Sequence, residues 1–307
     1  PDRIAQAEAY LTRAEASTRT GVPGVVPVVY PITGFEYSYG LYALLLTDLL
    51  DHPALREVVA GKLAEMEAIF ALENSLSFGD QFVPDVDVTA IAVALFRSTG
   101  KPCDSNPILR FWNSDHFFTY THELNPSVYS NAHALHALTL CGSRCPATER
   151  FLTQRQTADG LWIADKWHSS WRSTMLEVIL ALHSLGYPQH LLHAAEALMR
   201  DQRPDGSWGT LTSASYLETT YALMSLRLVR SAVGSRPDIN GALARAERWL
   251  TSHAHLRQTV EVRWMGKDIY SPVRVDRAYQ LATLCRVMMD AEQSSILPQS
   301  QIRARAA

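Results

Sequence analysis

The heptapeptide QTADGLW (156–162) recurs 46 residues later as QRPDGSW (202–208), and both copies fit the pattern QxxDGxW. In each copy the Asp-Gly pair favours a tight turn, and the tryptophan supplies a large apolar side chain that can be buried beside it. We therefore assign Trp162 and Trp208 to stability rather than to chemistry. A repeat of about this length is typical of stacked helical hairpins.

The same period runs through the segments rich in Ala and Leu in the rest of the chain. Their equivalent positions are separated by 44, 44, 43, 45 and 56 residues and lie at Ala43, Asp87, Asn131, Thr174, Thr219 and Val275. Open helical solenoids have similar periods, but six copies favour closure into a ring. We predict an all-α fold, an (α/α)6 toroid, whose six inner helices start at one rim and enclose a cavity.

Helical spacing of apolar residues is common along the chain, whereas strand signals are scarce. Turn-rich breaks such as STGKPCDSNP (98–107) separate the helices. We expect helices at 3–17, 36–50, 54–72, 86–98, 127–140, 146–156, 173–186, 190–201, 215–231, 239–252 and 273–291. We divide the chain into an N-terminal helix or edge segment (1–20), the toroid (21–292) and a disordered tail (293–307).

Composition excludes several classes of protein. The chain has 307 residues, of which 47% are hydrophobic, and a net charge of −3, which gives no nucleic-acid footprint. It has no apolar run long enough to span a membrane, and its first residues, PDRIAQAEAYL, lack the order of a signal peptide. We therefore expect a cytoplasmic protein with no transmembrane segment and no nucleic-acid partner.

Two acids, Asp85 and Asp87, stand in PDVDVTA (84–90), directly before an apolar run that reads as a buried helix. Acids are seldom placed against a core without a partner. Taken alone, the pair fits a helix N-cap, which is a common role for Asp. The motifs around it change that interpretation.

Several motifs, in order along the chain, resemble the toroids of terpenoid cyclases and protein prenyltransferases. The resemblance is strongest to the β domain of bacterial class II, or protonation-initiated, diterpene and sesquiterpene cyclases. It covers about residues 20 to 290 and includes Tyr30 at a position where Trp is usual. The motifs are the two QxxDGxW copies, DVDVTA, PVVYPITGFE (27–36), LNPSVYSNAHALHAL (124–138), DKWHSS (165–170), YLETTYAL (216–223) and WMGKDIYSPVRVDRA (264–278).

The resemblance implies a role for the two acids. Class II chemistry protonates a terminal alkene or epoxide, which is a weak base, so the acid must be strong, oriented and shielded from water. The family pattern is Asp-x-Asp-Asp or Asp-x-Asp-Thr, and by that match Asp87 is the proton donor and Asp85 its supporting partner. Adjacent carboxylates also oppose each other's ionisation. Val88 departs from the pattern, and whether it tunes or weakens the acid stays open.

Asn131 resembles the family residue that hydrogen-bonds the acid, so we expect its amide to orient the donated proton. His133 lies two residues further on. We interpret it as a half-buried histidine with satisfied hydrogen bonds rather than as a catalytic group.

Cations formed in the cavity need electron-rich walls. The aromatic candidates are Trp112, Tyr129, Trp167, Tyr216 and Trp264. A prenyl diphosphate also needs cations that hold it without cleaving it, often together with Mg²⁺. Lys166, Lys267 and Arg274 are the candidates for this role, and we assign no metal ligand to the protein itself. No DDxxD motif, the mark of ionisation-initiated synthases, is present.

The resemblance therefore predicts an enzyme that converts a linear prenyl diphosphate, such as geranylgeranyl diphosphate, into a bicyclic labdane- or copalyl-type diphosphate. Family members carry a second toroid, the γ domain, which we do not find in this sequence. A separate γ-like subunit, a missing region or a self-sufficient toroid would each account for this. The alternatives are a farnesyl diphosphate (drimane-type) cyclase, a squalene-type cyclase and a non-catalytic toroid supporting an active partner. A protein prenyltransferase subunit would need a zinc set that is not evident.

Overall fold

The computed structural model describes residues 32–79, 82–121, 123–163, 165–265 and 272–296, together with 4–6, 8, 9 and 12. The chain divides into two units, Pro1–Pro31 and Ile32–Ala307. The described residues of the first unit are helical. Most of the predicted segment 1–20, as well as Tyr30 and Lys267, lies outside the described residues.

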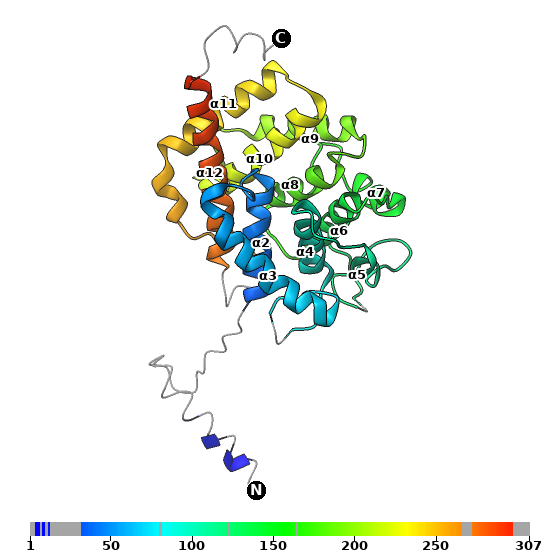
Figure 1. Cartoon of the computed structure of the whole chain (residues 1–307). Coiled ribbons are helices and arrows are strands. Elements are labelled where there is room, and N and C mark those ends of the chain that lie inside the picture. The colour runs from blue at the N-terminus through cyan, green and yellow to red at the C-terminus, as the bar shows by residue number, and fades with distance from the viewer. Residues whose placement is uncertain are drawn as a thin grey trace. The chain divides into compact units, whose positions relative to one another are not determined.

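Alternate helices of the second unit form a closed inner ring (Figure 1). Each inner helix packs against the next, and the last packs against the first. The inner helices are α2 (Thr33–Leu46), α4 (Val86–Ser98), α6 (Val128–Leu140), α8 (Trp171–Leu182), α10 (Tyr216–Val233) and α12 (Val273–Ile296). The helices between them lie outside the ring and are α3 (Arg56–Glu73), α5 (Asn106–Leu109), α7 (Pro146–Thr153), α9 (Pro188–Asp201) and α11 (Pro237–Ser252). The predicted all-α toroid is confirmed.

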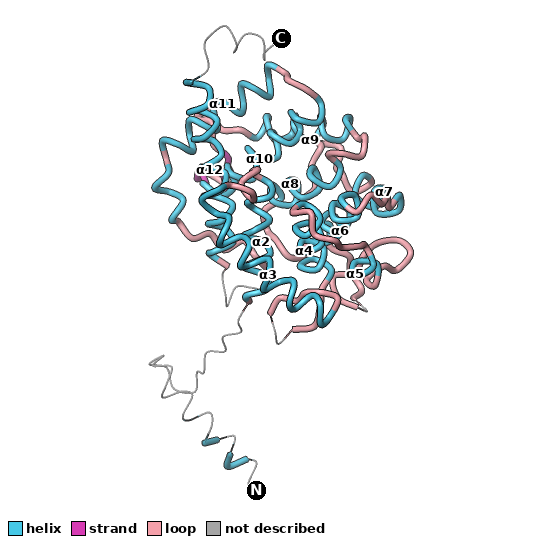
Figure 2. Tube along the Cα trace, in the orientation of Figure 1, coloured by secondary structure: helices cyan, strands magenta, loops and turns pink. Residues whose placement is uncertain are grey.

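Some details differ from the prediction. Figure 2 shows helices joined by loops, with one small hairpin in which β1 (Trp208–Thr210) pairs antiparallel with β2 (Ser213–Ser215). Short 3-10 turns occur at η1 (Pro53–Leu55) and η2 (Ala254–Gln258). Helix α12 runs to Ile296, so the first four residues of the predicted tail are helical, because no helix breaker precedes Pro298. None of the described helices is both long and apolar enough to cross a bilayer.

Four inner helices begin with the same device at one end of the ring, which we call the N-terminal rim. The side chain of the residue before each helix accepts a hydrogen bond from the backbone N–H three residues on, which satisfies a donor that the helix cannot. These caps are Asp85 for α4, Ser127 for α6, Ser170 for α8 and Ser215 for α10.

In α4 and α10 the residue four positions after the cap clamps the loop that leads into the helix. Thr89 Oγ1 accepts from the N–H of Leu76 and donates to its carbonyl, both at 3.0 Å. Thr219 Oγ1 is bonded in the same way to the N–H and carbonyl of Trp208, at 2.9 and 3.2 Å. Each clamp fixes one loop end, so the inner helices and the rim loops hold each other in place.

The QxxDGxW copies join successive helical hairpins. Trp162 and Trp208 are buried, and each indole N–H donates at 2.8 Å to a carbonyl ten residues earlier, on Leu152 and Leu198 respectively. The glutamine that starts the second copy, Gln202, bridges the carbonyls of Gly206 and Ala242, which lies on the next outer helix. The stability role predicted for both tryptophans agrees with these contacts.

The glycine of the second copy cannot carry a side chain. Gly206 has φ +95°, and a Cβ there would lie 2.6 Å from the carbonyl oxygen of Arg245. Gly142 also has a positive φ, +77°, but open space around it. We expect Gly142→Ala to lower the free energy of unfolding by about 1 kcal/mol through backbone strain alone. Gly206→Ala should lower it by about 2–4 kcal/mol because the clash is added. Urea denaturation of both variants checks this, and equal effects would contradict it.

Candidate active site

The centre of the inner ring is filled with buried titratable and aromatic side chains. They project from the inner faces of five of the ring helices, so segments far apart in the sequence meet on one axis. They are Tyr39 and Tyr42 of α2, Asp87 of α4, Tyr129 and His133 of α6, Glu177 of α8, and Tyr279 of α12.

Asp87 lies in the first turn of α4 and is 9% exposed. The hydroxyl of Tyr39 donates to its Oδ2 at 2.5 Å, and Nδ1 of His133 lies 2.6 Å from its Oδ1. Each carboxyl oxygen therefore accepts from a different neighbour. Each oxygen has two lone pairs, and one on each faces Tyr39 or His133. A proton on Asp87 would therefore occupy the other lone pair of one oxygen.

His133 is 1% exposed and stands between two acids. Its Nε2 lies 2.9 Å from Oε2 of Glu177, opposite the contact with Asp87. Burial alone would lower the pKa of His133, but the carboxylates of Asp87 and Glu177 outweigh it and raise that pKa to about 10. The two acids thus favour the imidazolium form of His133, and because the ring is fully buried its interpretation as a half-buried histidine is wrong.

The tyrosines around the acid are neutral. Burial, assisted by the nearby carboxylates, raises the pKa values of Tyr39, Tyr42, Tyr129 and Tyr279 well above their usual range. Neutral phenols donate hydrogen bonds and present electron-rich faces. Both properties suit a cavity in which an acid is oriented and a cation is formed.

Asp85 positions the acid by capping its helix. It is buried, and its Oδ1 accepts from the backbone N–H of Val88 at 2.8 Å. In PDVDVTA, Asp85 therefore caps the helix and Asp87 points into the ring. Asp85 thereby fixes the start of the helix that carries Asp87, and its support of a catalytic acid stays a prediction.

Asn131 does not contact the acid. Its amide donates to the carbonyls of Phe117 and Ser127 at 2.9 and 2.8 Å and accepts from the N–H of Phe117 at 2.8 Å. It thus occupies the clamp position of α6, four residues after the cap, as Thr89 does in α4. The predicted hydrogen bond from Asn131 to Asp87 is wrong, because the amide is already fully used in holding a rim loop.

Two of the predicted aromatic residues lie beside the acid. The ring of Trp264 is 5.3 Å from that of Tyr39 and 6.0 Å from that of Tyr129, measured between centroids. Its indole N–H donates to Asp276 at 3.0 Å, and burial raises the pKa of Asp276 to about 7. Tyr129 is itself 6.4 Å from Tyr39 in a stacked arrangement.

The other aromatic candidates lie elsewhere. Tyr216 points outward, since its hydroxyl donates to the carbonyl of Leu250 on α11, so its placement on the cavity wall is wrong. Trp112 packs on Phe117 at 4.8 Å, and none of its described contacts is with Asp87. Trp167 packs edge-on against Tyr120. Burial and the charges of both Asp85 and Asp87 raise the pKa of Tyr120.

The candidate cations are paired at the rim. Lys166 contacts the carboxylate of Glu123 and the carbonyl of Asn125. Arg274 lies 3.0 Å from Oε2 of Glu36, and four-fifths of its side chain is exposed. A diphosphate would have to displace or share these carboxylates. Binding of substrate by Lys166 and Arg274 stays a prediction.

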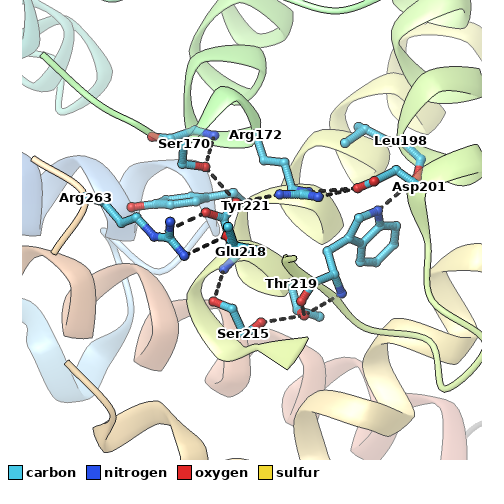
Figure 3. A network of polar contacts seen from close by, with 12 residues as sticks. Ser170, Arg172, Leu198, Asp201, Ser215, Glu218, Thr219, Tyr221 and Arg263 are labelled. Carbon is cyan, nitrogen blue, oxygen red and sulfur yellow. Dashed lines mark hydrogen bonds and ion pairs between the residues drawn. The ribbon is translucent and has the colours of Figure 1, made fainter. Parts of the chain in front are cut away.

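A buried polar network holds the segment that carries Trp264 (Figure 3). Glu218 Oε2 accepts from Ser170 at 2.7 Å and from Arg172 at 3.0 Å, and its Oε1 lies 3.4 Å from Nε of Arg263. The carbonyl of Arg263 accepts from the N–H of Ser169 at 2.7 Å. This network was not expected from the sequence, although Glu218 and Ser170 both fall within family-like motifs.

A pocket of about 840 Å³ opens at the opposite end of the ring, among the C-terminal ends of the inner helices. Its charged groups pair with each other: Arg227 lies 2.7 Å from Glu247 and 2.9 Å from Asp290. This pocket is remote from Asp87, so we place the chemistry at the N-terminal rim.

No protein-family model matches the chain. The (+)-kolavenyl diphosphate synthase of Herpetosiphon aurantiacus is 35% identical to it over 289 residues, which cover 94% of this chain and 55% of that protein. The terpentedienyl-diphosphate synthase of Kitasatospora griseola is 33% identical over 289 residues, covering 89% and 55%. The chain is a relative of the bacterial class II diterpene cyclases. It spans about half the length of these curated relatives.

Two solved structures share the fold over most of this chain. The ent-copalyl diphosphate synthase from Streptomyces platensis matches 91% of this chain and 54% of its own, with a TM-score of 0.74 and 29% identity. The type II terpene cyclase MstE from Scytonema shares the fold at 15% identity, with a TM-score of 0.58, 83% coverage of this chain and 91% of its own.

Proposed function

We propose that this chain provides the acid-bearing toroid of a class II diterpene cyclase that converts geranylgeranyl diphosphate into a bicyclic, copalyl-type diphosphate. The observation that carries the proposal is the placement of Asp87, buried at the rim and bonded on one oxygen to Tyr39 and on the other to the His133 imidazolium. The names of the relatives, which are diphosphate synthases, support a product that retains its diphosphate.

The proposed reaction starts with transfer of the Asp87 proton to the terminal double bond. The new C–H bond leaves a tertiary cation, and the neighbouring double bonds close two rings onto it. The carboxylate left on Asp87 is stabilised by its two donors, Tyr39 and His133, which strengthens the acid. The rings of Tyr129 and Trp264 present electron-rich faces to the advancing cation. Loss of a proton ends the sequence, and the carbon–oxygen bond to the diphosphate stays intact.

We further propose that a second helical unit covers the N-terminal rim. The loops there expose large apolar side chains, with Leu124 at 91% and Leu211 at 94% exposure. The others are Val83, Ile163, Val260, Val262 and Met265. Large apolar side chains exposed on several loops at one end of a fold are consistent with a covering partner. The γ-like unit implied by the family resemblance, in the same polypeptide or in a partner subunit, would exclude water from Asp87.

We place the proposed Mg²⁺ on the diphosphate of the substrate rather than on this toroid. Within the described residues no group of three or more His, Cys, Asp or Glu side chains is arranged to hold a metal ion. The residues present therefore do not fit a resident metal site. Lys166 and Arg274 remain the described cations that we propose for the diphosphate.

The assay for this proposal offers geranylgeranyl diphosphate and farnesyl diphosphate, with Mg²⁺, to the chain alone and to the chain with any protein that co-purifies with it. We expect a bicyclic diphosphate from geranylgeranyl diphosphate, detected as the alcohol by mass spectrometry after phosphatase treatment. A product from farnesyl diphosphate alone would favour the drimane-type alternative. Free diphosphate released by the protein itself would contradict the proposal.

One observation favours a second candidate, a non-catalytic toroid that supports an active partner. Val88 stands where the family pattern has a polar residue, and its side chain is buried in the apolar core. The same assay separates the two candidates, because a supporting toroid would give no product with either substrate under any pairing.

A further inference from the structure

Glu177 is a buried carboxylate to which the proposed reaction gives no role. It lies in the second turn of α8, in the otherwise apolar stretch MLEVIL (175–180), and is 1% exposed. Its Oε2 lies 2.9 Å from Nε2 of His133, and its Oε1 accepts from the hydroxyl of Tyr279 at 3.4 Å. A carboxylate is seldom buried this deeply unless its charge is paired.

The position of His133 creates a charge problem for the acid. An imidazolium 2.6 Å from Asp87 favours the ionised form of that carboxyl group. An ionised Asp87 has no proton to give. A second negative charge on the far side of the imidazolium removes this conflict, because it offsets the positive charge that Asp87 experiences.

The acid motif does not supply that second charge. Val88 occupies the last position of the motif, where the family pattern has Asp or Thr, and its side chain is 1% exposed. We propose that Glu177 supplies the negative charge that lets Asp87 stay protonated beside the His133 imidazolium, in compensation for the polar group that Val88 lacks. The proposal rests on the proposed function, since it concerns the same acid.

The remaining groups around His133 are neutral. They are Tyr39 and Tyr42 from α2, Tyr129 and His136 from α6, Tyr221 from α10 and Tyr279 from α12. Burial raises the pKa of each tyrosine well above its usual range. Burial, assisted by the charge on His133, lowers the pKa of His136 to about 3.

The charged groups of the neighbouring elements have other partners. Asp85 caps α4 and Glu218 binds Arg172. Asp276 accepts from Trp264. Tyr120, from the loop before α6, is a neutral phenol whose pKa is raised by burial and by the two acids. Among the described residues, the charge that faces His133 from the side opposite Asp87 is that of Glu177.

The test is the pH dependence of turnover. The active form of the Asp87–His133 pair holds two protons, and the negative charge of Glu177 favours keeping both. Activity should fall as pH rises, when the pair loses one of them. We expect Glu177→Gln, which keeps the shape but not the charge, to move this high-pH limb of kcat to lower pH by about 1–3 units. Glu177→Asp, which keeps the charge, should restore the limb towards the wild-type position.

Glu149→Gln is the matched control. Glu149 is also buried and ion-paired, to Arg144, but it lies on the outer helix α7. Glu149→Gln should leave the pH of the high-pH limb of kcat unchanged. A limb that does not move in Glu177→Gln, whatever the loss of kcat, would show that Glu177 has only a structural role and would overturn the proposal.

A second measurement does not depend on turnover. In wild-type protein labelled with ¹⁵N-histidine, the ring nitrogens of His133, assigned by their loss in His133→Gln, should show imidazolium shifts at about pH 8, well above the usual histidine pKa. A neutral ring there would overturn the proposal. If no cyclisation is found but His133 is charged, the proposed function fails while the charge arrangement stands.

Discussion

Replacing Asp87 with Asn should lower the rate of cyclisation at least about 10³-fold, because a positioned general acid contributes about 10²–10⁴-fold and the alkene has no other way to gain a proton. Asn has the shape of Asp and can still accept the hydrogen bond from Tyr39. The fold should therefore survive. Single-turnover formation of the bicyclic product, followed with any co-purifying protein present, measures the effect.

Asp276→Asn is the informative control for this experiment. Asp276 is also a buried carboxyl group at the rim, and burial raises its pKa to about 7, so it is a rival proton donor by its pKa alone. Its carboxyl group, however, accepts a hydrogen bond from the indole N–H of Trp264 and lacks the pair of donors, Tyr39 and His133, that stabilise Asp87 as a carboxylate. We expect a much smaller loss than with Asp87→Asn. If Asp276→Asn caused the larger loss of activity, Asp276 on α12 rather than Asp87 on α4 would be the proton donor.

Truncation of Trp208 to Ala should lower the free energy of unfolding by about 3–5 kcal/mol, as large cavities in cores do. The side chain is fully buried, and its loss would also leave the carbonyl of Leu198 without its indole donor. Thermal or urea denaturation measures the change.

Trp112→Ala is the matched comparison for Trp208. Trp112 is half-buried and its described ring contact is with Phe117. Its truncation should cost clearly less than that of Trp208. Equal losses would show that the repeat tryptophans have no special part in joining the hairpins.

Most of the fold follows from spacing in the sequence. The two QxxDGxW copies and the 43- to 45-residue steps between equivalent helices predicted the alternation of inner and outer helices. The caps explain why the inner helices begin where they do, since Asp or Ser stands before each of four of them. The β1–β2 hairpin was missed because its strands are three residues long and carry no alternating pattern.

Only the part of the site that lies within a local sequence motif could be predicted. The motif DVDVTA placed Asp87 correctly at the start of an inner helix. It did not show which residue of α6 faces the ring axis. Tyr129 and His133 are four residues apart and share one face of α6, whereas Asn131 lies between them on another face. The rotation of a helix about its own axis is set by packing against its neighbours, so the choice of Asn131 over His133 went wrong.

The position of Glu177 in an apolar helix is a sequence signal that predicts a buried partner. A single acid in the middle of an apolar helix rarely survives without a partner. Its partner, His133, lies 44 residues away, which is one repeat. Residues one period apart meet in neighbouring inner helices, and a search for titratable pairs at that separation would have brought the two together.

The backbone clamps at the N-terminal rim fix the ends of three loops and leave the residues within those loops free to change. The loops at 77–84, 118–126 and 209–214 each start after a residue that is clamped by its backbone, on Leu76, Phe117 and Trp208, and each ends before a capping residue. Neither anchor depends on the side chains in between. The toroid is thus modular at its N-terminal rim: loops of new length or sequence can be exchanged there, while Asp87 and its neighbours on the ring axis keep their geometry.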